Sequence, residues 1–213
     1  MSPSLVHLAI ATPATLGYGE GKQMRTAIRK RGVESAWLDC DGFDGDNVAN
    51  HKYHGGPDRA VCCYPFEHYG EWQKAFGRPL DKAAFGENLT LAGMTEDEVC
   101  IGDVFRIGEA AIQITQGRTP CHTIERRTGM NGLVQRFVES GRTGYLCRVL
   151  EAGHIERSSR VTCLERDAAG VSVLDAHRLM FRQIDDGELR ARLLGVAALA
   201  AAWRDKIERQ LSP

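Results

Sequence analysis

The spacing of apolar residues changes near residue 170, and this change constrains the fold more than any other feature of the chain. Before it, short runs of β-branched or alternating apolar residues are separated by glycine-containing turns, as strands usually are. These runs are Leu5–Ile10, Ala60–Tyr64, Val104–Ile107, Ala111–Thr115 and Gly144–Leu150. After it, apolar residues recur at helical spacing. We therefore expect an α+β protein in which a β-rich body, residues 1–165, precedes a small helical subdomain, residues 170–213.

The tail is expected to form three short helices. Helical spacing begins at Ser172, Asp185–Leu189 and Leu194–Val196 mark breaks or helix starts, and Ala197–Leu211 has helical composition throughout. Helices this short bury little apolar surface alone, so the tail must dock on the body or on a partner. Inside the body, the clearest helical patterns cover Pro65–Phe76 and Asn131–Glu139.

The charge balance argues against several classes of protein. The formal net charge is -1 over 213 residues, and acidic and basic residues are interspersed, which is not typical of proteins that bind nucleic acid or a membrane surface. The first residues lack the basic and apolar segments of a secretory signal, and the apolar stretch Val196–Ala202 is too short to cross a bilayer. We expect a cytoplasmic protein, and a docked tail is compatible with a monomer or a dimer.

Seven cysteines, an odd number, stand at positions 40, 62, 63, 100, 121, 147 and 163. None belongs to a C-x-x-C pair, so the pattern fits neither a disulfide framework nor a zinc ribbon. Most of them are therefore expected to be small buried hydrophobic residues in a reducing compartment.

Cys121 is the first candidate for chemistry. The pattern of a half-buried strand over Ala110–Thr115 is broken by Gln116–Pro120, so Cys121 is expected in a turn just past a strand end. Arg118 and Arg126 lie near it in sequence, and cationic neighbours favour the thiolate, which is both a nucleophile and a soft metal ligand. A buried, inert cysteine is an equally good interpretation of these residues alone.

The second candidate is the segment His51–Ala60, which contains the paired glycines Gly55 and Gly56. Such glycines allow the backbone to turn tightly and to present N–H groups to an anion. The side chains that can add charge are Lys52, His54 and Arg59. The simpler interpretation is a turn with solvated basic residues. Neither the P-loop spacing nor the dinucleotide-binding spacing is present there.

The third candidate is Phe85–Thr90, where a glycine-led turn is expected to expose the carboxylate of Glu87 and the amide of Asn88. An amide both donates and accepts hydrogen bonds, which suits recognition of a pterin ring. Asparagine and glycine also simply make turns, and both interpretations stay open.

Several short motifs follow one another in a specific order: His54–Ala60, Tyr64–Pro65, His68–Tyr69, Phe85–Leu89, Val99–Asp103 and Arg118–Cys121. In this order they resemble the MOSC domain family, in its stand-alone YiiM-like branch. Thr26–Lys30 resembles the N-terminal motif of that branch, and the tail resembles its three-helix extension. The resemblance covers nearly the whole chain, and the order of the motifs is more specific than any one of them.

The resemblance implies a β-barrel-like body that binds a molybdenum cofactor, with Cys121 bound to the metal. It also implies an oxidoreductase that reduces N-hydroxylated compounds, such as hydroxylaminopurines, to amines. Residues predicted to hold the cofactor are Lys30, Lys52, His54, Gly55, Gly56, Arg59, Asn88 and Arg118, and those predicted to supply protons are His54 and His122. Relatives often have Gly-Asp-x-Gln-Ala-Asp where this chain has Gly45–Asn50, so no role is carried over to positions 48 and 50.

Electrons for such a reaction are expected from a separate reductase, a flavoprotein by analogy with the family. The chain has neither the C-x4-C-x2-C spacing of an iron–sulfur site nor a dinucleotide-binding motif. The main alternative function is a sulfur or metal-sulfur carrier in which Cys121 holds a persulfide. A third is a binding module in which the Gly-Gly turn holds an anionic ligand and Cys121 is inert; labelling of Cys121 by iodoacetamide separates it from the other two.

Overall fold

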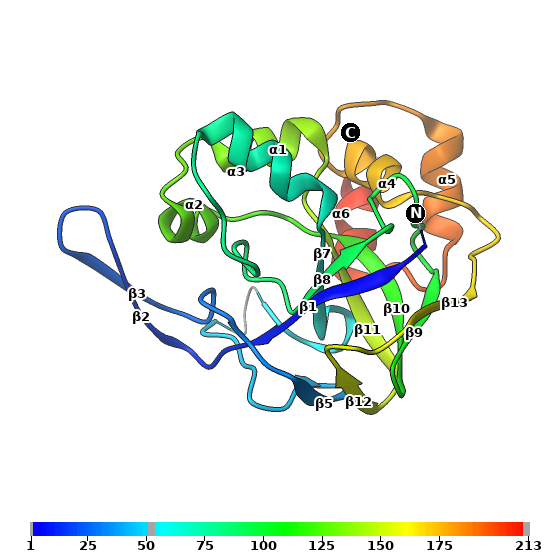
Figure 1. Cartoon of the computed structure of the whole chain (residues 1–213). Coiled ribbons are helices and arrows are strands. Elements are labelled where there is room, and N and C mark those ends of the chain that lie inside the picture. The colour runs from blue at the N-terminus through cyan, green and yellow to red at the C-terminus, as the bar shows by residue number, and fades with distance from the viewer. Residues whose placement is uncertain (1, 51–53, 211–213) are drawn as a thin grey trace.

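The protein is described by a computed structural model that covers residues 2–50 and 54–210 (Figure 1). Strands form the body, three helices lie on one side of it, and three more follow at the C-terminal end (Figure 1). The predicted α+β class, with a β-rich body before a helical tail, is confirmed.

The main sheet contains eight strands in the order β13-β9-β10-β11-β7-β8-β1-β4. In chain order they are β1 (Ser4–Ile10), β4 (Arg31–Gly32), β7 (Val61–Pro65), β8 (Leu89–Ala92), β9 (Val104–Ile107), β10 (Ala110–Gly117), β11 (Tyr145–Glu151) and β13 (Val161–Glu165). Neighbours run antiparallel except β7 and β8, which are parallel. All five predicted strand runs are strands in the structure.

The sheet curls without closing into a barrel. An isolated antiparallel bridge between Ser4 and Arg160 brings the beginning of β1 next to β13. The outer partner of β1 is nevertheless the two-residue strand β4, and no continuous ladder within residues 2–50 and 54–210 joins β1 to β13. The predicted barrel-like body is therefore an open, strongly curled sheet.

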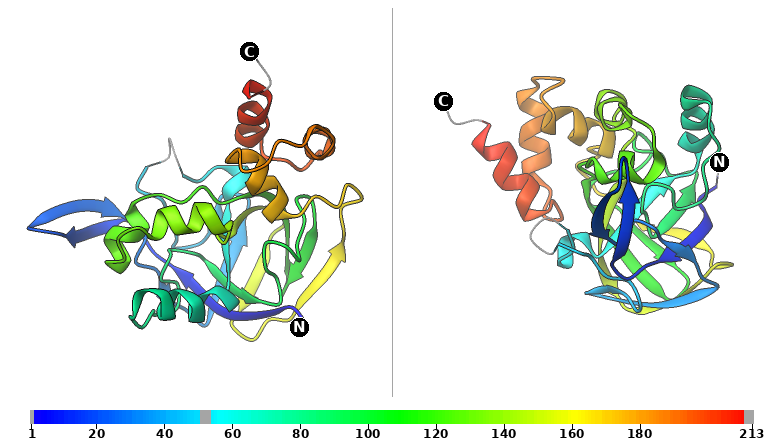
Figure 2. Two further views of the ribbon diagram at one scale, coloured as in Figure 1. Left: turned by 90° about the horizontal axis from the view of Figure 1, so that it is seen from above. Right: turned by 90° about the vertical axis from the view of Figure 1, so that its left-hand side faces the viewer.

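Two smaller sheets extend the body. One has the order β12-β5-β6, from Gly153–Glu156, Ser35–Asp39 and Gly42–Phe43. The other is a hairpin of β2 (Ala14–Tyr18) and β3 (Lys22–Thr26), which projects away from the body (Figure 1; Figure 2). The sequence pattern did not predict this hairpin.

Helices α1 (Glu67–Phe76) and α3 (Leu133–Ser140) cover a buried aromatic cluster that includes Tyr64, Phe85 and Phe137. The helix expected from Pro65 begins two residues later, because Pro65 is the last residue of β7 and is aligned with Leu91 of β8. The helix expected over Asn131–Glu139 is α3. A third helix of this layer, α2 (Thr123–Thr128), was not predicted.

The tail forms the three predicted helices: α4 (Val173–Met180), α5 (Gly187–Gly195) and α6 (Ala201–Arg209). Ser172 caps α4 by accepting a hydrogen bond from the Asp175 N–H at 3.0 Å, which satisfies a donor at the helix start. Buried residues of all three helices belong to the same hydrophobic core as the main sheet. The tail therefore docks on the body, as its amphipathic pattern required.

The last helix begins at Ala201 rather than at Ala197, because the preceding residues bind to the sheet. The Ala200 N–H donates to the Thr115 carbonyl at 3.0 Å, and Arg148 Nη2 donates to the Ala198 carbonyl at 3.0 Å. No helix among the described residues is both long enough and apolar enough to span a membrane.

The expectation that most cysteines are buried is wrong. Only Cys63 and Cys147 are buried, with their sulfur atoms 3.9 Å apart on neighbouring strands β7 and β11. Cys40 is exposed, and the other four, Cys121 included, are half-buried. Burial alone therefore does not make Cys121 an inert core residue.

Candidate functional site

A cavity of about 1080 Å³ lies where the end of β10, the turn around the paired glycines and helix α6 meet. Its lining comes from residues within 24–30, 39–50, 54–62, 116–123 and 202–206, together with Gly86, Asn88 and Leu146. Most of the residues predicted to bind the cofactor are in this lining: Lys30, His54, Gly55, Gly56, Arg59, Asn88, Arg118 and Cys121. Lys52 lies outside the described residues.

Cys121 is positioned between a strand end and a helix start. Strand β10 continues to Gly117, two residues further than predicted, and α2 begins at Thr123. The Arg118 N–H donates to the Gly144 carbonyl at 2.9 Å, and the Cys121 carbonyl accepts from the Ile124 N–H at 3.0 Å. The half-buried thiol therefore sits on a short loop that is fixed at both ends.

Arg118 carries its guanidinium into the cavity lining. Its Nη2 donates to the Phe85 carbonyl at 2.7 Å, whereas its Nη1 is buried and has no hydrogen-bond partner within the described part of the chain. Burial opposes the charge, but the nearby Cys62 and Cys121 raise the pKa of Arg118 above its ordinary value. The guanidinium is therefore a fixed positive charge beside the Cys121 thiol.

The paired glycines form the turn that the sequence predicted. Gly55 and Gly56 have φ angles of 77° and 90°, which favour glycine, and the short 3-10 helix η1 (Pro57–Arg59) follows. Burial, together with Arg118 and Arg59, lowers the pKa of His54. At neutral pH the uncharged imidazole therefore predominates.

Asp58, within η1, fixes this turn to the rest of the protein. Its carboxylate accepts from Arg148 Nη2 at 2.6 Å and from the Ala201 N–H at 3.2 Å. Its carbonyl accepts from the Thr115 hydroxyl at 2.6 Å. The turn is thus tied to strands β10 and β11 and to the first residue of α6.

Lys30 and Asn88 are both held by Asp46. Lys30 Nζ donates to Asp46 Oδ1, and Asn88 Nδ2 donates to Asp46 Oδ2 at 2.9 Å. Asn88 Nδ2 also lies 3.3 Å from the Ala9 carbonyl, and its Oδ1 accepts from the Cys62 N–H at 3.1 Å. The Asn88 amide therefore stabilises the wall of the cavity, and its N–H groups are not available to donate hydrogen bonds to a pterin ring.

Glu87 is buried rather than exposed, contrary to the sequence prediction. Its carboxyl accepts from the Tyr69 hydroxyl, from the Thr90 hydroxyl at 3.0 Å and from the Phe85 N–H at 3.1 Å. Burial raises the pKa of Glu87. The glycine-led turn at Gly86 therefore directs Glu87 into the interior, where it supports the aromatic cluster.

His122 lies outside the cavity lining. Its side chain is 76% exposed, and its Nδ1 lies 3.0 Å from Glu125 Oε2 within the first turn of α2. The adjacent Cys121 lines the cavity, whereas His122 is the residue directly before α2.

Several residues of the lining were not predicted from the sequence, including Cys62, Gln116 and Trp203. Burial raises the pKa of the Cys62 thiol to about 11, so this second thiol of the cavity stays protonated at neutral pH. Gln116 is recognisable in the sequence as the residue two positions before Arg118, on the same face of an extended strand. No local pattern of the tail shows that Trp203 reaches the cavity.

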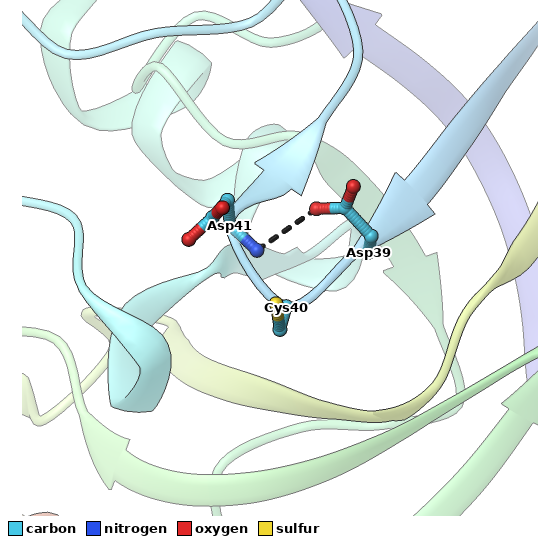
Figure 3. Close-up of side chains that lie close together, drawn as sticks. All are labelled: Asp39, Cys40 and Asp41. Atoms are coloured by element: carbon cyan, nitrogen blue, oxygen red, sulfur yellow. Dashed lines mark hydrogen bonds between the residues drawn. The ribbon is translucent and has the colours of Figure 1, made fainter.

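Three potential metal ligands, Asp39, Cys40 and Asp41, lie close together at the turn between β5 and β6 (Figure 3). The Asp41 N–H donates to the Asp39 carboxylate at 2.9 Å, which is an ordinary way of closing a tight turn (Figure 3). Cys40 and Asp41 are exposed. This turn is sufficient to explain the cluster, and we assign no metal to it.

Two family models match successive parts of the chain: the MOSC domain at residues 50–162, and the YiiM-like, 3-alpha helix domain at residues 171–212. The uncharacterized protein YflK of Bacillus subtilis is 43% identical over 202 residues, which cover 94% of this chain and 91% of that protein. A reductase of Gibberella moniliformis is 32% identical over 166 residues, 75% of this chain and 29% of that protein.

The crystal structure of YiiM from Geobacillus stearothermophilus superposes with a TM-score of 0.83 at 29% identity and covers 99% of this chain and 100% of that chain. The resemblance stated from the short motifs is therefore confirmed at the level of the family models and of the fold. This chain belongs to the MOSC domain family and carries a YiiM-like, 3-alpha helix domain after its MOSC domain.

Proposed function

We propose that this protein is a molybdenum-cofactor-dependent oxidoreductase that reduces N-hydroxylated compounds, such as hydroxylaminopurines, to amines. The observation that carries the proposal is the position of the Cys121 thiol in the lining of a large cavity that also contains Lys30, Arg59 and Arg118. Membership of the MOSC family supports a molybdenum cofactor. The name of the fungal relative, a reductase, supports an oxidoreductase.

The donor set of the cavity fits such a cofactor. A cysteine thiolate is a soft ligand that suits a metal bound through sulfur, and lysine and arginine side chains suit a phosphate group. The buried Arg118 Nη1 and Gln116 Oε1 lack partners within the described part of the chain, so the lining offers both a donor and an acceptor to a polar ring. The cavity, about 1080 Å³, is large enough for a cofactor and a small substrate.

The chain contributes binding and positioning. When bound, molybdenum supplies the two-electron chemistry by which oxygen is removed from nitrogen. Cys121 would hold the metal, Lys30, Lys52 and Arg59 would hold the phosphate, and Arg118 would donate to the polar ring. The backbone of the Gly55–Gly56 turn allows a close approach of the anion.

His54 is better placed than His122 to handle the proton, since only His54 lines the cavity. Its lowered pKa keeps the imidazole uncharged at neutral pH, so one ring nitrogen can accept a proton while the other carries one. Electrons would come from a separate flavoprotein reductase, because the sequence contains neither an iron–sulfur spacing nor a dinucleotide-binding motif.

The test compares metal and pterin content in three proteins from a host that makes the cofactor: wild type, Cys121→Ala and Cys163→Ala. Cys163 is a matched control, because it is also half-buried but lies on β13, outside the cavity lining. We expect molybdenum and pterin in wild type and in Cys163→Ala, and much less molybdenum in Cys121→Ala.

Equal molybdenum in Cys121→Ala and wild type would refute the assignment of Cys121 as the ligand. A wild type without molybdenum or pterin, but with sulfane sulfur on Cys121, would favour the alternative of a sulfur carrier. Turnover of 6-hydroxylaminopurine with a chemical electron donor, present in wild type and lost in Cys121→Ala, would support the reductase directly.

A further inference from the structure

The end of β10 presents alternate residues to two different surroundings. Gln116 and Arg118 both line the cavity, whereas Gly117 between them faces the tail. A Cβ atom on Gly117 would lie 2.8 Å from Cη2 of Trp203, so the indole ring packs directly against the strand backbone. The strand end is therefore fixed from the tail side, and its two polar side chains are directed to the cavity side.

Gln116 is almost fully buried, with 4% of its surface exposed, and its amide is only half satisfied. Its Nε2 donates to the Gly117 carbonyl at 3.2 Å, which fixes the amide so that Oε1 faces away from that carbonyl. Oε1 is buried and has no hydrogen-bond partner among residues 2–50 and 54–210. An unpaired buried acceptor costs the folded state free energy unless water or a ligand donates to it, so in this cavity lining Oε1 is free to accept a hydrogen bond from a ligand.

Arg118 offers the complementary group. Its Nη2 is used by the Phe85 carbonyl, and its Nη1 is buried and lacks a partner in the same described residues. One free acceptor at the end of β10 and one free charged donor just past that end thus lie two residues apart in sequence, in the lining that also contains Cys121. Together, this acceptor and this donor match a ligand that carries one hydrogen-bond donor and one acceptor.

We infer that Gln116 and Arg118 form a recognition pair for a ligand. This ligand donates an N–H or O–H hydrogen to Gln116 Oε1, and one of its oxygen atoms accepts a hydrogen bond from Arg118 Nη1. Under the proposed function, on which the identity of the ligand rests, two groups have this chemistry: the ring of the pterin and an N-hydroxylated base. A carrier that holds only a persulfide on Cys121 presents no such pattern. Gln116 is thus a specificity-determining residue of the cavity.

The test uses Gln116→Met, which keeps the length of the side chain and removes the acceptor. Gln113→Met is the matched control, because Gln113 lies on the same strand and donates from Nε2 to the Gly102 carbonyl at 3.1 Å but is absent from the cavity lining. Two quantities are measured on protein purified with its cofactor: the rate at which pterin is lost on dialysis, and the dissociation constant for 6-hydroxylaminopurine by calorimetry.

We expect one of the two quantities to change by about two- to tenfold in Gln116→Met and by less in Gln113→Met, which is the effect of one lost hydrogen bond. Faster loss of pterin would identify the cofactor as the ligand of the recognition pair. Weaker binding of the purine would identify the substrate as that ligand. Gln116→Glu, which keeps an acceptor oxygen, should retain more binding than Gln116→Met.

If Gln116→Met matches Gln113→Met in both quantities, the inference is wrong. It is also wrong if the wild type retains no pterin and does not bind the purine. A wild type without pterin would overturn the proposed function as well. In a wild type that retains pterin, failure of the recognition pair appears as equal values for Gln116→Met and Gln113→Met, whereas failure of Cys121 as the ligand appears as equal molybdenum in wild type and Cys121→Ala.

Discussion

Replacing Asp46 by alanine tests how the wall of the cavity is held together. The Asp46 carboxylate accepts from Lys30 Nζ, from Asn88 Nδ2 at 2.9 Å and from the Ala11 N–H at 2.6 Å. The side chains of Lys30 and Asp46 are only 7% and 12% exposed. Asp46→Ala therefore leaves a nearly buried ammonium group without its counter-ion, and leaves two hydrogen-bond donors without this acceptor.

The expected loss in the free energy of unfolding is about 3–5 kcal/mol. Removing one partner of a buried ion pair costs about this much, because the remaining charge is uncompensated. The two lost hydrogen bonds are each worth about 1 kcal/mol but share the same acceptor with the ion pair, so their energies are not simply additive. A loss of this size is a large fraction of the roughly 5–15 kcal/mol that stabilises a typical domain.

Urea unfolding followed by circular dichroism measures this loss, and Glu151→Ala provides the control. Glu151 pairs with Arg106 at 2.7 Å, but its side chain is 59% exposed, so its removal should cost less than about 1 kcal/mol. The double variant Lys30→Met with Asp46→Ala should recover part of the loss, because no unpaired charge remains. An Asp46→Ala variant as stable as Glu151→Ala would refute the argument and would mean that water hydrates the Lys30 ammonium.

Three further changes test the packing around the site. Gly117→Ala places a Cβ atom 2.8 Å from the buried Trp203 ring, so the free energy of unfolding measured in urea should fall by about 1–3 kcal/mol. An unchanged free energy of unfolding would mean that α6 shifts freely. Asp58→Ala removes the partner of Arg148 and of the first α6 N–H, so hydrogen exchange in α6 should be faster; unchanged protection would contradict this role. Burial lowers the pKa of His177, so the folded state loses stability as pH falls through the ordinary histidine value of about 6.5, by at most about 1.4 kcal/mol per pH unit. His177→Gln should show a shallower slope between pH 7.5 and 5.5, because the lowered pKa values of His54 and His7 keep part of it, and an identical slope would exclude His177 as a source.

The fold could be predicted from the sequence wherever apolar residues repeat over a full element. The five strand runs of the body and the helices of the tail have this property, and all of them are present. Helix α2 was missed because its six residues are mostly polar and too short to show a period. The hairpin of β2 and β3 was missed because it buries little, so its residues need no apolar alternation.

The site could be predicted only in part, because sequence motifs show which residues are near a turn but not which way their side chains point. Cys121, His54 and Arg118 were named, and they meet in one lining. Glu87 and Asn88 were expected to be exposed, yet both are buried, and each makes hydrogen bonds to several neighbouring groups. Gln116 was overlooked because its significance is an unpaired atom, which only the packed structure reveals.

The three-helix tail takes part in building the cavity. Trp203 packs against the backbone of Gly117, and the side chains on either side of that residue, Gln116 and Arg118, face the cavity. The first N–H of α6 binds Asp58, which holds the turn of the paired glycines. The glycine turn and the strand end at Gly117, which leads into the cysteine loop, are about sixty residues apart in sequence, and α6 contacts both. Because α6 is too short to be stable alone, its docking and the geometry of the site must form together.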